Sequence, residues 1–176
     1  MMALERGLIQ VYTGEGKGKT TAALGLALRA AGHGLRVEIV QFMKGWPGYG
    51  ELKSVSLLPG VAIHPFGREG WVHPAQPEPE DLALAEKALE FAWEAMVGGE
   101  IDIVILDEIN VALDYGLLSL ERVLRLLEGK PPAVELILTG RNAHSEVIGR
   151  ADLVTEMRKV KHPFDAGLAA RQGIEY

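Results

Sequence analysis

The 176-residue chain is 48% hydrophobic and contains no cysteine. This length and hydrophobic content suffice for one packed domain but not for two, so residues 1–176 are expected to form a single domain. The net charge of −6 argues against DNA, RNA or an anionic membrane as the main partner, because those partners usually require a large basic surface. The lack of cysteine excludes disulfides and thiolate metal sites.

Targeting signals are also missing from the sequence. The apolar runs are all shorter than the ~18 residues that span a bilayer. The first thirty residues lack the charged start and apolar centre of a secretion signal. We therefore expect a cytoplasmic protein with neither a nucleic acid nor a membrane as partner.

The first predicted elements are a strand at 8–12 and a helix over 22–28, separated by Thr-Gly-Glu-Gly-Lys-Gly-Lys-Thr-Thr. A glycine-rich turn between a strand and a helix is typical of a phosphate-binding loop, although the usual first glycine is here Thr13. The residues expected to bind ATP in this loop are Gly14, Glu15, Gly16, Lys17, Gly18, Lys19, Thr20 and Thr21.

The residue types of this loop suit a triphosphate. Glycines allow backbone angles that let consecutive N–H groups face phosphate oxygens, at the positive end of the following helix. Lys19 adds a full positive charge, and Thr20 adds a hydroxyl suited to Mg²⁺. A mobile glycine turn would explain neither residue, so we predict a phosphate site.

Further apolar runs predict strands at 37–42, 101–106, 134–138 and 151–154, and helical patterns separate most of them. This alternation predicts an α/β fold with a mainly parallel sheet flanked by helices on both faces. Together with the phosphate loop, it indicates the P-loop NTPase (RecA-like) architecture.

Two helices have clear boundaries in the sequence. Over 80–97, Leu89, Trp93 and Met96 share a face with Leu82, which predicts Trp93 to lie in the core. A second helix over 119–127 has Ser119 as its N-cap and ends before a glycine.

Segments 44–54 and 66–79 are rich in glycine, proline and aromatic residues and do not predict regular structure. Both follow predicted strands. Ligands of open parallel sheets lie beyond the carboxyl ends of the strands, so both segments are candidate binding loops.

Asp107 and Glu108 follow the apolar strand at 101–106. An acid at this point of a phosphate-loop protein holds Mg²⁺ together with the loop threonine, so the candidate metal ligands are Thr20, Asp107 and Glu108. Because side chains alternate along a strand, the two acids are expected to point in different directions.

Other polar residues also lie near predicted strand ends. Gln41, Lys44 and Arg141 follow such ends and are candidates for a ribose or phosphate contact. Arg29 is a weaker candidate for ATP, because it lies ~15 Å along the helix from Lys19 and would have to reach back. The five histidines show no metal-ligand spacing.

These residues leave the reaction open. Taken alone they favour attack on the γ-phosphorus, with Glu108 orienting a water molecule as in a RecA-like motor ATPase. A small-molecule kinase would need an arginine-rich lid, and none is evident in the sequence. A non-catalytic subunit that senses ATP is a further alternative.

Five segments resemble the phosphate-loop family of corrinoid adenosyltransferases, from about residue 7 to residue 176. They are residues 14–21, 40–45, 104–108, 138–141 and the tail 160–167 with 172–176. The phosphate loop and the acidic strand occur in many nucleotide-binding proteins. The Lys-His-Pro-Phe-Asp-Ala-Gly tail serves no general phosphate-loop purpose, and it is the specific signal.

The resemblance implies transfer of the 5′-deoxyadenosyl group of ATP to the Co(I) of a reduced corrinoid, with release of triphosphate. It implies Lys19, Thr20 and Glu108 as catalytic residues and Mg²⁺, or Mn²⁺ in its place, as the metal. It further implies a homodimer and an electron-donating reductase, such as a flavoprotein.

In this family aromatic side chains displace the lower axial ligand of the corrinoid. Trp71 is the matching tryptophan. The family's phenylalanine two residues earlier is here Glu69, and Phe66 is the nearest replacement. Trp71 and Phe66 are therefore the candidate corrinoid contacts.

Overall fold

The computed structural model describes residues 4–176 and contains one sheet of six strands, in the order β3-β2-β4-β5-β1-β6. All neighbouring strands are parallel, which confirms the predicted α/β fold with a parallel sheet. The strands are β1 (Ile9–Thr13), β2 (Val37–Phe42), β3 (Val61–Phe66), β4 (Ile103–Asp107), β5 (Glu135–Thr139) and β6 (Leu153–Glu156). The helices are α1 (Lys19–Ala31), α2 (Gly50–Val55), α3 (Pro79–Val97), α4 (Ile109–Asp114), α5 (Leu120–Glu128), α6 (Ser145–Arg150) and the short 3₁₀ helix η1 (Pro163–Ala166).

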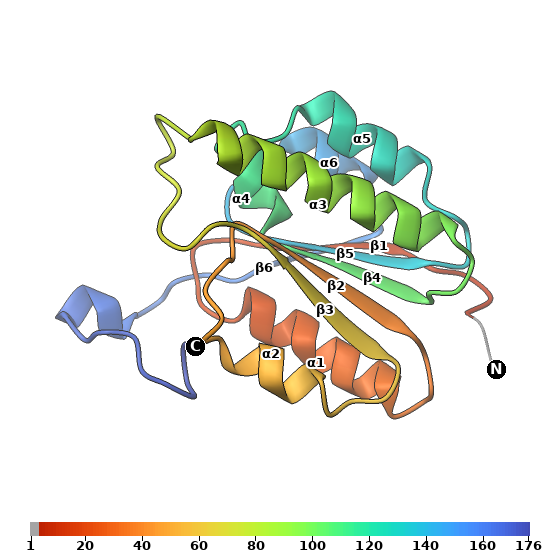
Figure 1. Cartoon of the computed structure of the whole chain (residues 1–176), viewed down its shortest axis with the longest axis horizontal. Helices are drawn as coiled ribbons and strands as arrows, with labels where there is room; N and C mark the ends of the chain where they lie inside the picture. Colours follow the sequence, from red (N-terminus) through yellow and green to blue (C-terminus); the bar gives the residue numbers. More distant parts are fainter. Residues whose placement is uncertain (1–3) are drawn as a thin grey trace.

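Helices cover both faces of the sheet, with α3, α4, α5 and α6 on one face and α1 and α2 on the other (Figure 1). The central strand β4 contributes to both cores. Val104 and Leu106 pack toward α3 and α5, whereas Ile103 and Ile105 pack toward α1. Continuous apolar strands form here because both sides of the sheet are buried.

Most predicted elements occur within two residues of their expected positions. Ser119 caps α5 by accepting a hydrogen bond from the backbone N–H of Arg122. Within residues 4–176, no helix combines the length and the hydropathy needed to cross a bilayer.

A strand is expected before residue 66, but the apolar runs give no bounds for β3 because His64 and Pro65 interrupt its pattern. Pro65 is tolerated there because β3 is an edge strand, where a missing N–H need not break the ladder. Helices α2, α4 and α6 were also not predicted. Each has only six residues, which is too few to show a helical period. Residues 44–54 are therefore not wholly irregular, because α2 begins at Gly50.

The prediction that Trp93 lies in the core is wrong. Leu89 and Met96 are buried, but 41% of Trp93 is exposed. The buried side of α3 is formed largely by alanines, which let the helix approach the sheet, and Trp93 lies beside that stripe. Its ring packs against Gly129 at the end of α5, next to an open hollow of about 450 Å³ between α3 and α5.

Candidate functional site

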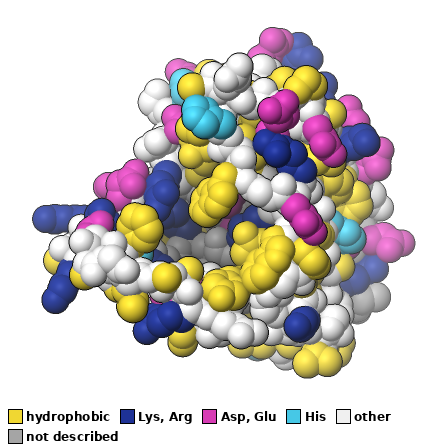
Figure 2. All heavy atoms as spheres, turned by 60° about the vertical axis from the view of Figure 1, so that its left-hand side comes forward, with side chains coloured by type: hydrophobic (Ala, Val, Ile, Leu, Met, Phe, Trp, Pro, Cys, Tyr) yellow, Lys and Arg dark blue, Asp and Glu magenta, His cyan; other side chains and the backbone are white. Residues whose placement is uncertain are grey.

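Backbone strain marks the carboxyl ends of the strands, which lie on the left of Figure 1. Among residues 4–176, the non-glycine residues with positive φ are Met43, Glu108 and Asn142. They follow β2, β4 and β5. Such conformations persist where the surrounding structure holds them, often at functional sites. Figure 2 shows this side as a hollowed face with hydrophobic and basic side chains around the hollow.

The predicted phosphate loop joins β1 to α1 at this edge. Gly18 immediately precedes the helix and has φ 118°, a backbone angle that requires glycine at this position. The Lys19 ammonium donates to the carbonyl oxygens of Gly14 at 2.6 Å and of Gly16 at 2.8 Å. Burial lowers the pKa of Lys19 from its ordinary value. A lysine held inside the loop is positioned to meet an anion that enters it.

The C-terminal tail backs this loop. The N–H of Gly16 donates to the carbonyl of Met157 at 2.6 Å, and the N–H of Met157 donates to Thr13 at 2.8 Å. A Cβ on either Gly14 or Gly16 would lie 2.6 Å from the Met157 carbonyl oxygen. These glycines therefore make room for the tail, and the Gly16 N–H is already engaged by protein.

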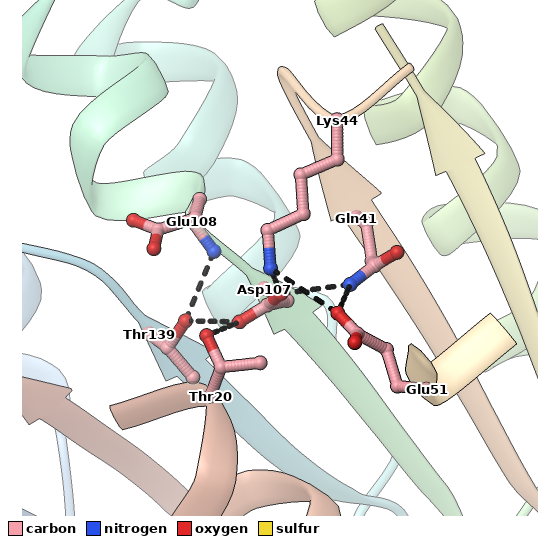
Figure 3. Close-up of polar contacts among 7 residues, drawn as sticks. All are labelled: Thr20, Gln41, Lys44, Glu51, Asp107, Glu108 and Thr139. Atoms are coloured by element: carbon pink, nitrogen blue, oxygen red, sulfur yellow. Dashed lines mark hydrogen bonds and ion pairs between the residues drawn. The ribbon is translucent and has the colours of Figure 1, made fainter. Parts of the chain in front are cut away.

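Asp107 lies at the centre of a buried polar network (Figure 3). Its Oδ1 accepts from the hydroxyls of Thr20 and Thr139, each at 2.8 Å. Its Oδ2 accepts from Lys44 at 2.7 Å and Gln41 at 3.1 Å. Burial favours the protonated acid, but the Lys44 charge and these hydrogen bonds outweigh it and lower the pKa of Asp107. The carboxylate is therefore ionised.

Glu108 lies in a different environment from Asp107. It has φ 68° and precedes α4, and its N–H donates to the Thr139 hydroxyl at 2.9 Å. Its carboxylate points away from Asp107 (Figure 3), which confirms the predicted divergence of the two acids. Burial, together with the charge of Asp107, raises the pKa of Glu108.

The three predicted metal ligands offer oxygen atoms, which a hard cation prefers, although the Glu108 carboxylate points away from Asp107. Thr20 is hydrogen-bonded to Asp107, and no hydrogen bond to the Glu108 carboxylate occurs among residues 4–176. Residues 4–176 contain no group of three or more acidic or histidine side chains that would hold a metal without other ligands. A Mg²⁺ ion that takes most of its ligands from water and phosphate suits this set.

The remaining ATP candidates, Arg141, Gln41 and Arg29, lie in different parts of the fold. Arg141 lies beside the phosphate loop, with its Nε 3.3 Å from Glu15. Gln41 is fully buried, and its Oε1 has no hydrogen-bond partner within the described residues 4–176. Arg29 lies in the last turn of α1, so the fold does not bring it to the loop.

Sequence reasoning missed part of the network. Thr139 contacts both acids, and Glu51 lies 3.8 Å from Lys44. Thr139 had two signals in the sequence, its place at the end of a strand and its position in the segment 138–141, but neither indicated a contact with the acids. Glu51 gave no signal because α2 was not predicted.

The two corrinoid candidates have different surroundings. Phe66, in β3, packs against Phe91 of α3 with ring centroids 5.6 Å apart. Trp71 lies in the following loop, and 95% of it is exposed. The exposed indole provides a large apolar surface next to the strand ends.

Comparison with known proteins identifies the family of this chain. Residues 5–176 match the family described as ATP:corrinoid adenosyltransferase BtuR/CobO/CobP. The chain belongs to this family.

Curated relatives agree with this assignment over nearly the whole chain. A corrinoid adenosyltransferase of Pseudomonas aeruginosa is 41% identical over 98% of this chain and 85% of its own length. One from Sinorhizobium sp. is 43% identical over 98% and 81%, and one from Escherichia coli K12 is 42% identical over 98% and 87%.

Membership in the corrinoid adenosyltransferase family makes the chain an ATP-dependent transferase that adenosylates corrinoids. ATP and a corrinoid are its two substrates. This confirms the resemblance found in the sequence. The ATPase, kinase and sensor alternatives are not favoured.

Proposed function

We propose that this protein transfers the 5′-deoxyadenosyl group of ATP to the Co(I) of a reduced corrinoid and releases intact triphosphate. The supporting observation is that a site for a polyanion and an exposed tryptophan loop follow strands of one sheet at the same edge. A reaction between a triphosphate ester and a large flat molecule requires both features side by side.

The bond changes of this reaction need no nucleophile from the protein. The electron pair of Co(I) forms the cobalt–carbon bond at C5′, and the C5′–O bond breaks with its electron pair on triphosphate. The cobalt becomes formally Co(III), and an external reductase, such as a flavoprotein, supplies the Co(I) starting state. The protein's tasks are to hold the charge of the leaving group and to align the two substrates.

Residues of the phosphate loop would hold that leaving group. Lys19 places a full positive charge inside the loop, and Thr20 is oriented by its hydrogen bond to Asp107. A bound Mg²⁺, or Mn²⁺, would be held by Thr20 and Glu108, with Asp107 acting directly or through Thr20, and it would supply Lewis-acid charge neutralisation. Arg141 is positioned to add a further charge next to Glu15.

At the other end, Trp71 would displace the lower axial ligand of the corrinoid, with Phe66 as the nearest second aromatic. Loss of that ligand makes the cobalt easier to reduce. We place the enzyme in the cytoplasm as a homodimer, in cobalamin biosynthesis or salvage.

Product analysis tests this function directly. Purified protein is incubated with ATP, Mg²⁺ and cobinamide under strong reductant, and the cobalt spectrum is followed. The proposal predicts a new cobalt–carbon bond and one triphosphate released per bond formed. ADP and orthophosphate without alkylated corrinoid would instead identify a RecA-like ATPase.

A further inference from the structure

Two loops at the strand ends touch each other through their backbones. Gly45, after β2, lies against Gly67 and Arg68, after β3. A Cβ on Gly67 would lie 2.5 Å from the backbone nitrogen of Lys44, and one on Gly45 would lie 2.5 Å from the carbonyl carbon of Arg68. Real Cβ atoms essentially never come within 3.0 Å of such atoms. We call this the Gly45–Gly67 contact.

The backbone angles do not explain these glycines. Neither Gly45 nor Gly67 has a φ in the left-handed region that favours glycine. Glycine is needed here because it has no side chain, which lets the loop after β2 approach the loop after β3 closely. The close approach is therefore the feature that these two residues serve.

The loop after β2 is fixed to the phosphate end of the site. Lys44, next to Gly45, donates to Asp107 at 2.7 Å, and its ammonium lies 5.5 Å from the centre of the Tyr49 ring. Met43, on the other side of Lys44, has φ 58° and packs against the core. The backbone at Gly45 is thus held relative to Asp107.

The loop after β3 is fixed to the start of α3. Arg68 donates from Nε to Asp81 Oδ1 at 2.7 Å and from Nη2 to Oδ2 at 3.2 Å, a two-pronged pairing with a buried carboxylate. The hydrogen bonds from Arg68 lower the pKa of Asp81. Asp81 also accepts from the N–H of Glu78 at 3.0 Å. The Arg68 guanidinium additionally lies 3.5 Å from the Trp71 carbonyl oxygen.

We infer that the Gly45–Gly67 contact and the Arg68–Asp81 pair are positioning elements that set the Trp71 loop relative to the phosphate site. This inference rests on the proposed function, since it assigns Trp71 to the corrinoid. In-line transfer needs the reacting atoms at about 3–3.5 Å, and a displacement of ~1 Å costs on the order of 100-fold in rate. A contact from one loop to the other is what fixes that distance.

Substitution of Gly67 tests the contact. The extra Cβ of Gly67→Ala must move from 2.5 Å to at least 3.0 Å from the Lys44 nitrogen, which separates the loops. The control is Gly149→Ala in α6, where nothing lies within 4 Å of the added atom. Equilibrium dialysis gives the dissociation constants of ATP and of cobalamin, whose lower ligand Trp71 is proposed to displace, and steady-state assays give kcat with cobalamin.

We expect Gly67→Ala to bind ATP within about twofold of wild type, while cobalamin affinity and kcat with cobalamin each fall about tenfold or more. Gly149→Ala should match wild type in all three quantities. Two results would overturn the inference. One is a Gly67→Ala enzyme indistinguishable from Gly149→Ala, and the other is an equal loss of ATP and cobalamin binding, which marks general damage.

Arg68 provides a second test that does not depend on a crowded glycine. Arg68→Ala should reproduce the corrinoid-specific loss, and Arg68→Lys, which keeps the charge without the two-pronged geometry, should restore part of it. If Gly67→Ala does not fold, the two Arg68 variants provide the test, and an Arg68→Ala enzyme with normal cobalamin affinity and kcat refutes the inference. A wild-type protein that forms no cobalt–carbon bond would refute the proposed function instead.

Discussion

The phosphate end and the corrinoid end of the site are built in opposite ways. At the phosphate end, Lys19 and Asp107 are buried and are held by partners from the loop, from α1 and from strands β2 and β5. At the corrinoid end, the Trp71 ring is almost fully exposed, on a loop whose Arg68 pairs with Asp81. One end encloses its charged groups in a buried network, and the other presents an exposed ring above the Gly45–Gly67 contact and the Arg68–Asp81 pair.

The difference follows from what each end has to bind. Stabilising the charge of a departing triphosphate requires donors that are fixed before the reaction begins. A flat, largely apolar ligand requires apolar surface that stays accessible until the ligand arrives. Changes at the phosphate end should therefore affect every corrinoid substrate, and changes at the corrinoid end should discriminate among them.

Lys19→Ala should have the largest effect. The variant loses the buried charge that faces the leaving triphosphate, and we expect kcat to fall by at least about 10³-fold with every corrinoid. The measurement is cobalt–carbon bond formation with cobalamin and with cobinamide. Lys53→Ala, which removes an exposed lysine of α2, is the control. A Lys19→Ala enzyme that keeps wild-type-like turnover would contradict the proposed role.

Glu108→Gln should have the next largest effect on activity. We expect a loss of about 10²-fold, because the amide binds Mg²⁺ poorly while the neighbouring network stays intact. The Mg²⁺ concentration needed for half-maximal rate should rise in parallel. An unchanged Mg²⁺ requirement would remove Glu108 from the metal site and leave Thr20 and Asp107.

The same variant makes a pH-dependent prediction for the protein without ATP and metal. Because the pKa of Glu108 is raised above 4.5 in the folded state, the wild-type free energy of unfolding falls as pH rises from 4.5 through the raised value. Glu108→Gln lacks this loss, so its stability relative to wild type should increase between acidic and neutral pH. Urea unfolding at several pH values measures the difference, and a pH-independent difference would argue against a raised pKa of Glu108 in the folded state.

The contrast between the two ends also explains which features were readable from sequence. Lys19, Thr20, Asp107 and Glu108 were predicted because each follows a strand or starts a helix, and the parallel sheet brings those positions together. Their partners were harder to predict. The role of Thr139 depends on β5 lying beside β4 in the sheet, and sheet order is not written in any local pattern.

Other features depended on packing between distant segments. The sequence explains Gly14 and Gly16 by backbone freedom, but of the two only Gly14 has a positive φ, and the close approach of Met157 requires both to be glycine. Trp93 shares a helical face with buried residues yet remains partly exposed, because the alanines of α3 set how closely the helix approaches the sheet. Neither the Gly45–Gly67 contact nor the Arg68–Asp81 pair had a sequence signal.

Trp71→Ala should have a smaller and more selective effect than either change at the phosphate end. We expect about a tenfold loss with corrinoids that carry an attached lower ligand and little loss with cobinamide, because only the former need displacement. ATP affinity should not change, since Trp71 lies outside the phosphate loop. Rates with cobalamin and cobinamide, compared in parallel, provide the test, and equal losses on both would end the displacement hypothesis.

Tyr176→Ala should have the smallest effect, and it probes the tail that backs the phosphate loop. The tail is held at one end by Met157 and at the other by Tyr176, whose ring lies edge-on to Trp46 at 5.3 Å. Such a contact contributes about 0.5–1.5 kcal/mol, so its loss should increase local opening up to about tenfold.

Tryptic cleavage after Lys161 measures this opening. We expect faster cleavage in Tyr176→Ala, and wild-type cleavage in Tyr176→Phe, which keeps the ring. ATP affinity should stay unchanged in both variants, because Met157 remains paired with Thr13 and Gly16. A large loss of ATP binding in Tyr176→Ala would mean that the whole tail, and not only its first residues, supports the phosphate loop, and the rigid end of the site would then extend to the C-terminus.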